Sequence, residues 1–534
     1  MSWKAVVEGG DPPIPRAGTR DLTFADIAAD AEALIHRCEA ALRSVPRPGE
    51  PPLVRQLRAE LGPNDDFRAQ DAGQGGSGPW LLYLHPVVDP QRLRLEVEAP
   101  LAAALRRGQS RLDGLWPTAD RAETPADAVL AVLRGNVAIV LGPGPGDGLL
   151  YDIAHQPGRQ VEQPTTEQVI VGPKAAFVEK LETNLALLRG WFPDASLRVR
   201  LLRVGRRGRS QVAVVYLQDV VRPGLVALIV DGLQRIRTDM IRTDWQIGEY
   251  LAAGSLTPFP LVEPTERPDK TASALADGRV AILVEHTPFA LLLPTSVFEF
   301  QTDSEAALPG PLVTTFIRGL RYMGTFLALI APGLTVSLVS ANPGPLRPEL
   351  ASTLAVTRVG LPYPVFPEML LMMLVVDIFS EATAQAPGGV GTALSIVGTL
   401  IIGQISVSAR LVSELVMIVA AATSLGAFLT LRYQFSYAVR IWKYVILLLS
   451  GVTGLFGWAA GMLFLLVHLA SLKSAGAPYL APLAPLHPRS LLYHVASRQP
   501  RPQSTARPSQ WKPQDRSEGN VNGTQEQRPG EAPS

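Results

Sequence analysis

The hydrophobic pattern divides the chain into a mixed first part and an apolar block that begins near residue 312. One segment of the block, 390–409, has no charged side chain over about twenty positions, enough for a helix to cross a hydrocarbon core roughly 30 Å thick. We therefore expect a transmembrane helical domain over residues 311–472. Its apolar segments are expected at 312–341, 366–384, 390–409, 413–431 and 442–472.

Segment 390–409 carries a stripe of small side chains on one helical face. Such a stripe lets a neighbouring backbone come close, which is how helices associate in lipid. We predict a helix-packing interface there, formed by Gly391, Ser395, Thr399 and Gly403. Gln404, beside the stripe, is interpreted as an interhelical hydrogen-bonding residue or, alternatively, as a pore residue. A GxxxG pair in the last apolar segment, Gly457 and Gly461, is a second packing motif.

Ionisable residues inside the block are candidates for function, because a charge exposed to lipid is costly. Asp377 and Glu381 lie one helical turn apart, which favours either a pore that offers them water or a cation, or a structural salt bridge. The segment that carries them could also be a short, broken or re-entrant helix. Arg318 and Arg321 are interpreted as an anion-attracting mouth, as partners of these acids, or as side chains that reach the membrane interface.

The first part of the chain alternates amphipathic helices with short apolar strands. Residues 1–160 are expected to form one α/β subdomain. Its expected elements are a helix after Thr23, a strand at 80–86, a helix at 89–105 interrupted by Pro100, a helix from Pro125, and two strands joined by a hairpin connection at 142–148.

Residues 161–310 are expected to form a second α/β subdomain. The stripe of Phe177, Leu181, Leu185 and Leu188 predicts an amphipathic helix within 172–190. Its other expected elements are two strands around a basic turn (Arg206, Arg207 and Arg209), a helix with Pro223 at its first position, a helix ending at Gly278, and a strand pair at 280–286 and 289–297.

The predicted fold class is an α+β soluble N-terminal half, made of two α/β subdomains, followed by an α-helical transmembrane bundle. A membrane-proximal segment, 473–497, and a tail at 498–534 follow; the tail has almost no apolar residues and is expected to be disordered. An even number of full spans would keep the tail on the side of the soluble half. Arg432, Arg440 and Lys443 would then lie on the opposite side, which argues against this topology.

Composition and charge narrow the function classes. With 49 Lys and Arg against 48 Asp and Glu, the net charge of +1 argues against a nucleic-acid surface. The single cysteine, Cys38, cannot form an intramolecular disulfide, and the N-terminus lacks the apolar core of a signal peptide, so the soluble half is expected to be cytoplasmic. The histidines are scattered, and no HExxH, GxSxG or paired-cysteine motif occurs. We therefore expect no enzymatic activity, no cofactor and no metal.

Several stretches resemble the A subunits of bacterial spore germinant receptors. They are EQVIVGPKAAFVEKLETNLALLR, FPLVEPTERPDKTASALADGRVAILVEHTPFALLLP, FIRGLRY, LPYPVFPEMLLM, IIGQISVSARLVS and APYLAPLAPLHPR, and they occur in the family's order. The most specific piece contains the family motif residues Glu266, Arg267, Pro268 and Asp269.

The resemblance implies a multi-pass protein of the spore inner membrane that oligomerises into an ion conduit and triggers germination. It also implies two partner subunits, a transporter-like B type that binds the nutrient and a lipoprotein C type. Because AF-type stage V sporulation proteins share these motifs, a non-conducting accessory protein is an alternative. A secondary transporter is disfavoured, since no inverted repeat of broken helices is evident. The family usually has acids where this chain has Val359, Met373 and Ser408, and commonly has Glu at the position of Asp377. These changes argue against cation coordination at the first three positions.

Overall fold

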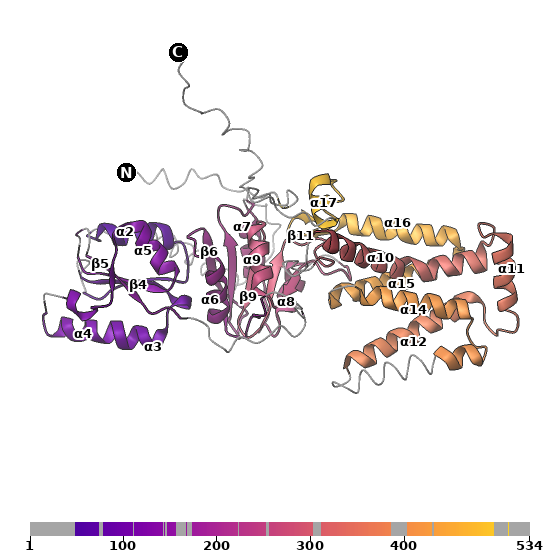
Figure 1. The fold of residues 1–534 in the computed structure, drawn as a ribbon, viewed down its shortest axis with the longest axis horizontal. Helices are drawn as coiled ribbons and strands as arrows, with labels where there is room; N and C mark the ends of the chain where they lie inside the picture. Colours follow the sequence, from indigo (N-terminus) through magenta and orange to yellow (C-terminus); the bar gives the residue numbers. More distant parts are fainter. Residues whose placement is uncertain are drawn as a thin grey trace, which may run out of the picture.

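The molecule is elongated, with two α/β units and a helical block arranged end to end (Figure 1). The computed structural model describes residues 49–495 and Trp511, apart from 74–77, 110–111, 143, 145–146, 156–166, 168–172, 223, 253–255, 303–310, 386–402 and 430–431. The expected helix after Thr23 lies outside the described residues, and so does the tail except for Trp511.

The first α/β unit is one antiparallel sheet with helices on both faces. Because side chains alternate along a strand, Leu82 of β2 packs under one helical layer and Leu81 under the other. The strands, in the order β1-β2-β4-β5-β3, are β1 (Phe67–Asp71), β2 (Trp80–Leu84), β3 (Asp120–Arg121), β4 (Asn136–Val140) and β5 (Gly148–Asp152). One layer holds α2 (Pro52–Leu61) and α5 (Pro125–Leu133); the other holds α3 (Pro90–Arg92), the π-helical η3 (Leu93–Glu98) and α4 (Ala99–Arg106).

Two local predictions in this unit are confirmed. The strands β4 and β5 pair antiparallel on either side of the glycine-rich segment 142–148, which is therefore a hairpin connection. The expected helix around Pro100 forms, but the predicted interruption is only a local widening, because the backbone stays helical at Glu98 and Ala99 and the π-helical turns of η3 end at Glu98. Proline lacks an amide hydrogen and crowds the carbonyl one turn before it, which explains why the regular helix is widened there.

The second α/β unit repeats this plan, with an antiparallel sheet between two helical layers. Its strands, in the order β6-β7-β9-β10-β8, are β6 (Leu197–Val204), β7 (Ser210–Leu217), β8 (Glu263–Thr265), β9 (Val280–Val284) and β10 (Ala290–Leu293). One layer holds α6 (Leu181–Trp191) and α9 (Pro268–Ala276), and the other holds α7 (Leu225–Gln234) and α8 (Asp244–Leu251).

The helix expected within 172–190 begins later, at Leu181, so Phe177 is not part of it. The Asn184 side chain accepts from the Val178 amide at 2.8 Å and donates to the Val178 carbonyl at 2.6 Å, which holds the preceding segment out of the helix. The Phe177 amide instead donates to the carbonyl of Glu266 at 2.7 Å. Helix α7 begins after Gly224, which has a left-handed φ of 81°, and Pro223 lies outside the described residues. Gly278 follows α9 with φ 88°, as expected for a helix end.

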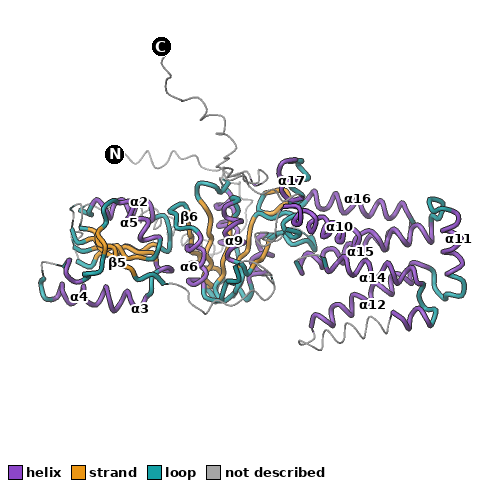
Figure 2. Tube along the Cα trace, in the orientation of Figure 1, coloured by secondary structure: helices purple, strands orange, loops and turns teal. Residues whose placement is uncertain are grey.

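The helical block begins with α10 (Pro311–Val336), which continues as the π-helical η6 (Ser337–Ala341). The following elements are α11 (Pro348–Thr357), α12 (Val365–Gln385), α14 (Glu414–Phe428), α15 (Tyr433–Thr453), α16 (Leu455–Ser471), the hairpin of β11 (Lys473–Ser474) and β12 (Ala477–Pro478), and α17 (Pro488–Val495) (Figure 2). Of the described helices, 312–341 and 433–453 are long and apolar enough to cross a membrane, and two further apolar helices of the block, 414–427 and 455–471, are shorter.

The apolar segment expected as one span over 442–472 is two helices. The chain turns at Gly454, which has φ 62° and ψ −136°, and α16 then packs back along α15. A residue with a Cβ rarely adopts that backbone conformation, whereas glycine does so at little cost. Helices α10 and α15 lead away from the second α/β unit, and α14 and α16 return toward it (Figure 1).

The chain therefore leaves the helical block on the face next to the soluble half. Ser474 of β11 accepts a hydrogen bond from the Thr295 amide at 2.9 Å and donates one to the Leu261 carbonyl at 2.6 Å. Arg432, at the start of α15, lies on this same face. The prediction that Arg432 would lie on the side opposite the soluble half is thus wrong. The turn at Gly454 divides the segment expected as one span into α15 and α16, so the chain passes through the block twice after Arg432 and leaves it on the side of Arg432.

Candidate functional site: a buried ion cluster between the soluble half and the helical block

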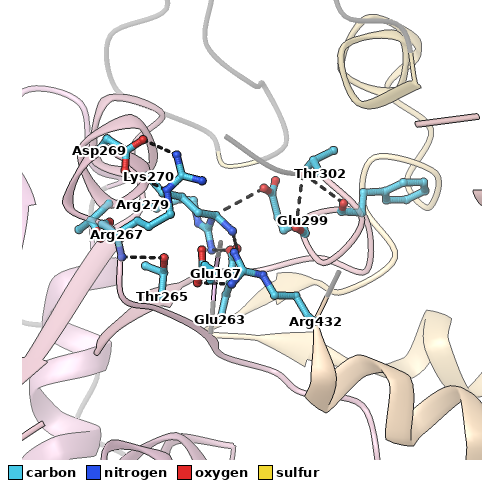
Figure 3. Close-up of polar contacts among 12 residues, drawn as sticks. Glu167, Glu263, Thr265, Arg267, Asp269, Lys270, Arg279, Glu299, Thr302 and Arg432 are labelled. Carbon is cyan, nitrogen blue, oxygen red and sulfur yellow. Dashed lines mark hydrogen bonds and ion pairs between the residues drawn. The ribbon is translucent and has the colours of Figure 1, made fainter. Parts of the chain in front are cut away.

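A fully buried carboxylate, Glu263, lies where the second α/β unit meets the helical block (Figure 3). It is the first residue of β8, the edge strand of the sheet. Three cations from different parts of the fold surround it. They are Lys270 of α9, Arg279 between α9 and β9, and Arg432 at the start of α15.

The contacts of Glu263 use both carboxylate oxygens. Arg279 Nη2 lies 2.6 Å from Oε2, whereas Lys270 Nζ is paired with Oε1 and Arg432 Nη2 lies 3.9 Å from that oxygen. The Nε of Arg279 donates to the carbonyl of Pro294 at 2.8 Å. One carboxylate thus holds together two elements of the soluble half and one helix of the block.

Two further carboxylates balance the three cations. Glu167 comes from the part of the chain that connects β5 to α6, and it pairs with Arg432. Glu299 precedes the helical block in the sequence and lies 3.7 Å from Arg279. This set of six residues, Glu167, Glu263, Glu299, Lys270, Arg279 and Arg432, is called the Glu263 cluster below. Its formal charges cancel, which is the condition under which buried ions are tolerated.

The cluster changes the acidity of its central carboxyl group. Burial by itself would raise the pKa of Glu263, but Lys270, Arg279 and Arg432 outweigh it and lower the pKa to about 2. The pKa of Glu167 is also lowered, against its burial, by Arg432 and Lys270. Both carboxylates, Glu167 and Glu263, are therefore ionised at neutral pH and attract the cations that join the two regions.

An aromatic layer lies beside the cluster and completes the joint. Phe300, from the soluble side, stacks on Phe435 of α15 with ring centroids 5.7 Å apart and planes 7° apart. Phe259 packs against the same ring at 5.8 Å, and Tyr479 after β12 contacts both Phe259 and Phe300. The amide of Val297 donates to the carbonyl of Tyr479 at 3.0 Å. Apolar packing and ion pairing therefore tie the same two regions together.

The four family-motif residues form the start of α9, next to the cluster. Arg267 precedes the helix and makes a buried pair with Asp269, with nitrogen–oxygen distances of 2.6 and 3.1 Å. Pro268 occupies the first helical position, where its missing amide hydrogen has no effect. Glu266 is buried, and its carbonyl accepts the amide of Phe177. The motif thus fixes the helix that supplies Lys270.

In the helical block, Asp377 and Glu381 have different surroundings. The Oδ2 of Asp377 accepts from Lys443 Nζ at 2.8 Å and from the Tyr444 hydroxyl at 2.7 Å, and Arg440 Nε lies 4.0 Å from Oδ1. Glu381 instead accepts from the Gln385 amide and the Tyr437 hydroxyl, each at 2.9 Å. A salt bridge of these acids to Arg318 or Arg321 is therefore wrong, since the cations that meet Asp377 come from α15.

The two arginines at the start of α10 contribute elsewhere. Arg318 is buried, and its Nη1 donates to the carbonyl of His494 in α17 at 2.9 Å, so it anchors the C-terminal segment to α10. The carbonyl of Arg321 accepts from the Thr325 hydroxyl within the same helix. Gln404 is exposed in this single chain.

The packing motifs also lie in different settings. Gly391, Ser395 and Thr399 lie outside the described residues, and the nearest atom to a Cβ at Gly403 would be Met417 Sδ at 3.7 Å. At Gly457 a Cβ would come within 2.0 Å of the Leu449 carbonyl oxygen, and at Gly461 within 3.2 Å of Ile446. Gly457 and Gly461 therefore face α15 in the helical hairpin of one chain.

Most of the Glu263 cluster was missed by sequence reasoning. Lys270 and Arg279 flank apolar stretches as ordinary surface residues do, and Arg432 was considered only for topology. A usable signal was Glu263 itself, an acid inside the apolar run FPLVEP. Among the described residues no group of three His, Cys, Asp or Glu side chains is arranged to hold a metal ion.

Comparisons with known proteins place the chain in a family. Residues 55–510 match the family described as "GerA: Bacillus/Clostridium GerA spore germination protein". Spore germination protein B1 of Bacillus subtilis (strain 168) is 30% identical over 434 residues, which cover 80% of this chain and 90% of that protein. The chain therefore belongs to the GerA family of spore germination proteins.

Two other Bacillus subtilis (strain 168) relatives differ in their descriptions. "Uncharacterized membrane protein YfkQ" is 28% identical over 425 residues, 78% of this chain and 82% of that protein. "Stage V sporulation protein AF" is 29% identical over 398 residues, 74% of this chain and 80% of that protein. A solved structure, the N-terminal domain of the A subunit of the Bacillus megaterium spore germinant receptor GerK3, matches with 23% identity and a TM-score of 0.34, covering 45% of this chain and 91% of that domain.

Proposed function

We propose that this protein is the A-type membrane subunit of a spore nutrient-germinant receptor and that copies of it assemble into an ion conduit. The Glu263 cluster is the observation that carries the proposal. It joins the soluble half to the first residue before α15, so a displacement of the soluble half acts directly on a long helix of the block. A receptor subunit needs such a connection between a sensing region and a membrane region.

The surface of the helical block supports a multi-pass membrane protein. Large apolar side chains are exposed on its helices, including Phe326 of α10, Ile418 of α14, Val452 of α15 and Phe456 of α16, at 62, 65, 81 and 77% of their full exposure. Side chains of this kind are stable facing lipid and unfavourable facing water. Since the chain enters and leaves the block on one face, we place the soluble half and the C-terminal tail on the cytoplasmic (spore core) side.

Partners follow from the same proposal. The relatives are spore germination proteins, and the resemblance of this chain to receptor A subunits implies a transporter-like B-type subunit, a lipoprotein C-type subunit and further copies of the chain. The nutrient would bind to the B-type subunit, and the signal would reach this chain through contacts outside the Glu263 cluster, which is enclosed.

Deletion of this chain in its own spore-forming host tests the proposal. Deleted spores should fail to release monovalent ions in response to at least one nutrient, and the full chain supplied in trans should restore the release. An Arg432→Met variant should be present at a reduced level or restore release only in part, with Arg206→Met, an exposed turn residue, as the matched control. Normal ion release from deleted spores with every nutrient would contradict the proposal.

A non-conducting accessory protein is the second candidate. It is favoured by the similarity to stage V sporulation protein AF and by the neutral residues Val359, Met373 and Ser408 in the block. Current recorded from the purified full chain in planar bilayers separates the two, because an accessory protein should carry none in any oligomeric state. A secondary transporter fits less well, since the described helices show no pair of broken spans in corresponding positions.

A further inference from the structure

A small cavity with a mixed lining of apolar and polar side chains lies inside the helical block, between α10, α12, α14 and α15. Its polar lining consists of Asp377 and Ser380 from α12, Thr423 and Ser424 from α14, and Arg440 and Lys443 from α15. Carboxylate and hydroxyl oxygens are the ligands that hard cations such as alkali ions prefer. The polar side chains of this lining thus include the oxygen-bearing groups that a monovalent cation prefers, with the hydroxyls of Ser380 and Thr423 donating to the carbonyls of Val376 and Val419.

The position beside the carboxylate is already filled by the chain itself. Lys443 is only 5% exposed, and its ammonium group lies 2.8 Å from Asp377 Oδ2. Arg440 adds a second positive charge on the other oxygen, at 4.0 Å. With one carboxylate and two cationic side chains, the lining carries a formal charge of +1, which repels a further cation at this distance.

We propose that Lys443 acts as a tethered cation, which occupies at Asp377 the place that a free monovalent ion would take and so keeps the cavity closed to cations. This inference rests on the proposed ion-conducting function and names the residue that limits it. Lysine suits the role because its ammonium is a compact point charge on a flexible chain, close in charge to a potassium or rubidium ion.

The location of Lys443 links the closed cavity to the soluble half. Lys443 follows Arg432 on one uninterrupted helix, about 16 Å further along its axis at 1.5 Å per residue. Because Arg432 belongs to the Glu263 cluster, a displacement of α15 at the cluster also moves the ammonium relative to Asp377. Withdrawal of Lys443 would free its place at Asp377 Oδ2 and leave a lining in which Asp377 and Arg440 balance each other, so that a free cation is no longer repelled.

Rubidium uptake by the full chain in liposomes tests the inference. Lys443→Met, which keeps the length of the side chain, should raise uptake by about tenfold over wild type, since it frees the place of the ammonium at Asp377 and lowers the formal charge of the lining from +1 to zero. Lys443→Arg keeps the charge and should behave as wild type. Asp377→Asn added to Lys443→Met should return uptake to the wild-type level.

Rubidium-dependent thermal stabilisation of the full chain in detergent is the second readout, and Lys443→Gln is a second variant in case Lys443→Met does not fold. If rubidium stabilises these variants and not the wild type, the tethered cation is supported. If, in addition, no variant takes up rubidium, the proposed ion conduit is contradicted and the tethered cation is not. Folded Lys443→Met or Lys443→Gln protein with wild-type uptake and no gain in stabilisation overturns the tethered cation.

Discussion

The Glu263 cluster and the group of ionised side chains around Asp377 differ in charge balance, in burial and in what surrounds them. The Glu263 cluster pairs three carboxylates with three cations, and its centre is fully enclosed. The Asp377 group sets one carboxylate against two cations, beside a cavity with hydroxyl groups. A balanced, enclosed cluster is suited to hold two regions together, whereas an unbalanced one beside a cavity is suited to exchange its ion.

The comparison also shows why α15 is central to the molecule. This helix contributes Arg432 to the first cluster, and Arg440 and Lys443 to the second. Apart from α15, the two clusters are built from different elements: the soluble half in one case and α12 in the other. A change in either cluster should therefore be felt at the other through the position of this one helix.

Glu263→Gln should have the largest effect on stability. It leaves Lys270, Arg279 and Arg432 buried with one carboxylate fewer, and breaking a buried pair in this way costs about 3–5 kcal/mol. Chemical unfolding of the detergent-solubilised chain measures the change. Glu299→Gln is the matched control and should cost less, because that side chain is 15% exposed and lies 3.7 Å from Arg279. Equal stability of the two variants would refute the central role of Glu263.

Acid should weaken the same joint. The pKa of Glu263 is lowered to about 2 in the folded chain from an ordinary value of 4.5. A carboxyl group with a lowered pKa stabilises the fold above its ordinary pKa, and this stabilisation is lost as the pH falls from about 4.5 toward 2. Its size is on the order of 3 kcal/mol. Unfolding free energies measured across this range should fall more steeply for wild type than for Glu263→Gln, and parallel curves would contradict the assignment.

The two small-residue motifs should respond differently to added side chains. Gly457→Ala places a Cβ against the Leu449 carbonyl and should destabilise the α15–α16 hairpin by about 2–3 kcal/mol. Gly403→Ala adds a methyl group where Met417 is at ordinary contact distance, so the isolated chain should keep its stability. Bulky Gly403→Leu and Ser395→Leu should disrupt assembly, which native gels of solubilised membranes measure as oligomer size. Unchanged oligomers for both would remove the stripe as an interface.

The local pattern of apolar and polar residues was sufficient to predict most helices and strands of the soluble half. It did not predict contacts between residues far apart in the sequence. The strands β7, β9 and β10 follow from largely apolar runs bounded by turn residues, and β6 follows from the partial alternation of Arg with Leu and Val in LRVRLLRV. The predicted start of α6 was wrong because the Asn184 side chain binds the backbone of Val178. Hydrophobic periodicity does not predict an interaction of this kind. The turn at Gly454 was missed because apolar residues continue on both sides of it.

Pairing of charges was the least predictable feature. The sequence placed Asp377 and Glu381 together because they are one turn apart, and it offered arginines of the first span as partners. In the fold, α15 lies against α12 and supplies Lys443 instead, and Glu381 meets Tyr437. Which helices are neighbours is a property of the whole block, and one sequence does not reveal it.

The smallest expected effect comes from separating these two acids. Asp377→Asn should lower the unfolding free energy by about 1–2 kcal/mol, since it leaves Lys443 and Arg440 without their carboxylate. Glu381→Gln keeps a side chain that can accept from the Tyr437 hydroxyl, and it should leave the melting temperature and the amount of oligomer unchanged. Thermal unfolding and gel filtration of the two variants in parallel make the comparison. If Glu381→Gln is the more damaging, the two acids have been assigned the wrong way round, and the ion that matters in the block lies one turn nearer the end of α12.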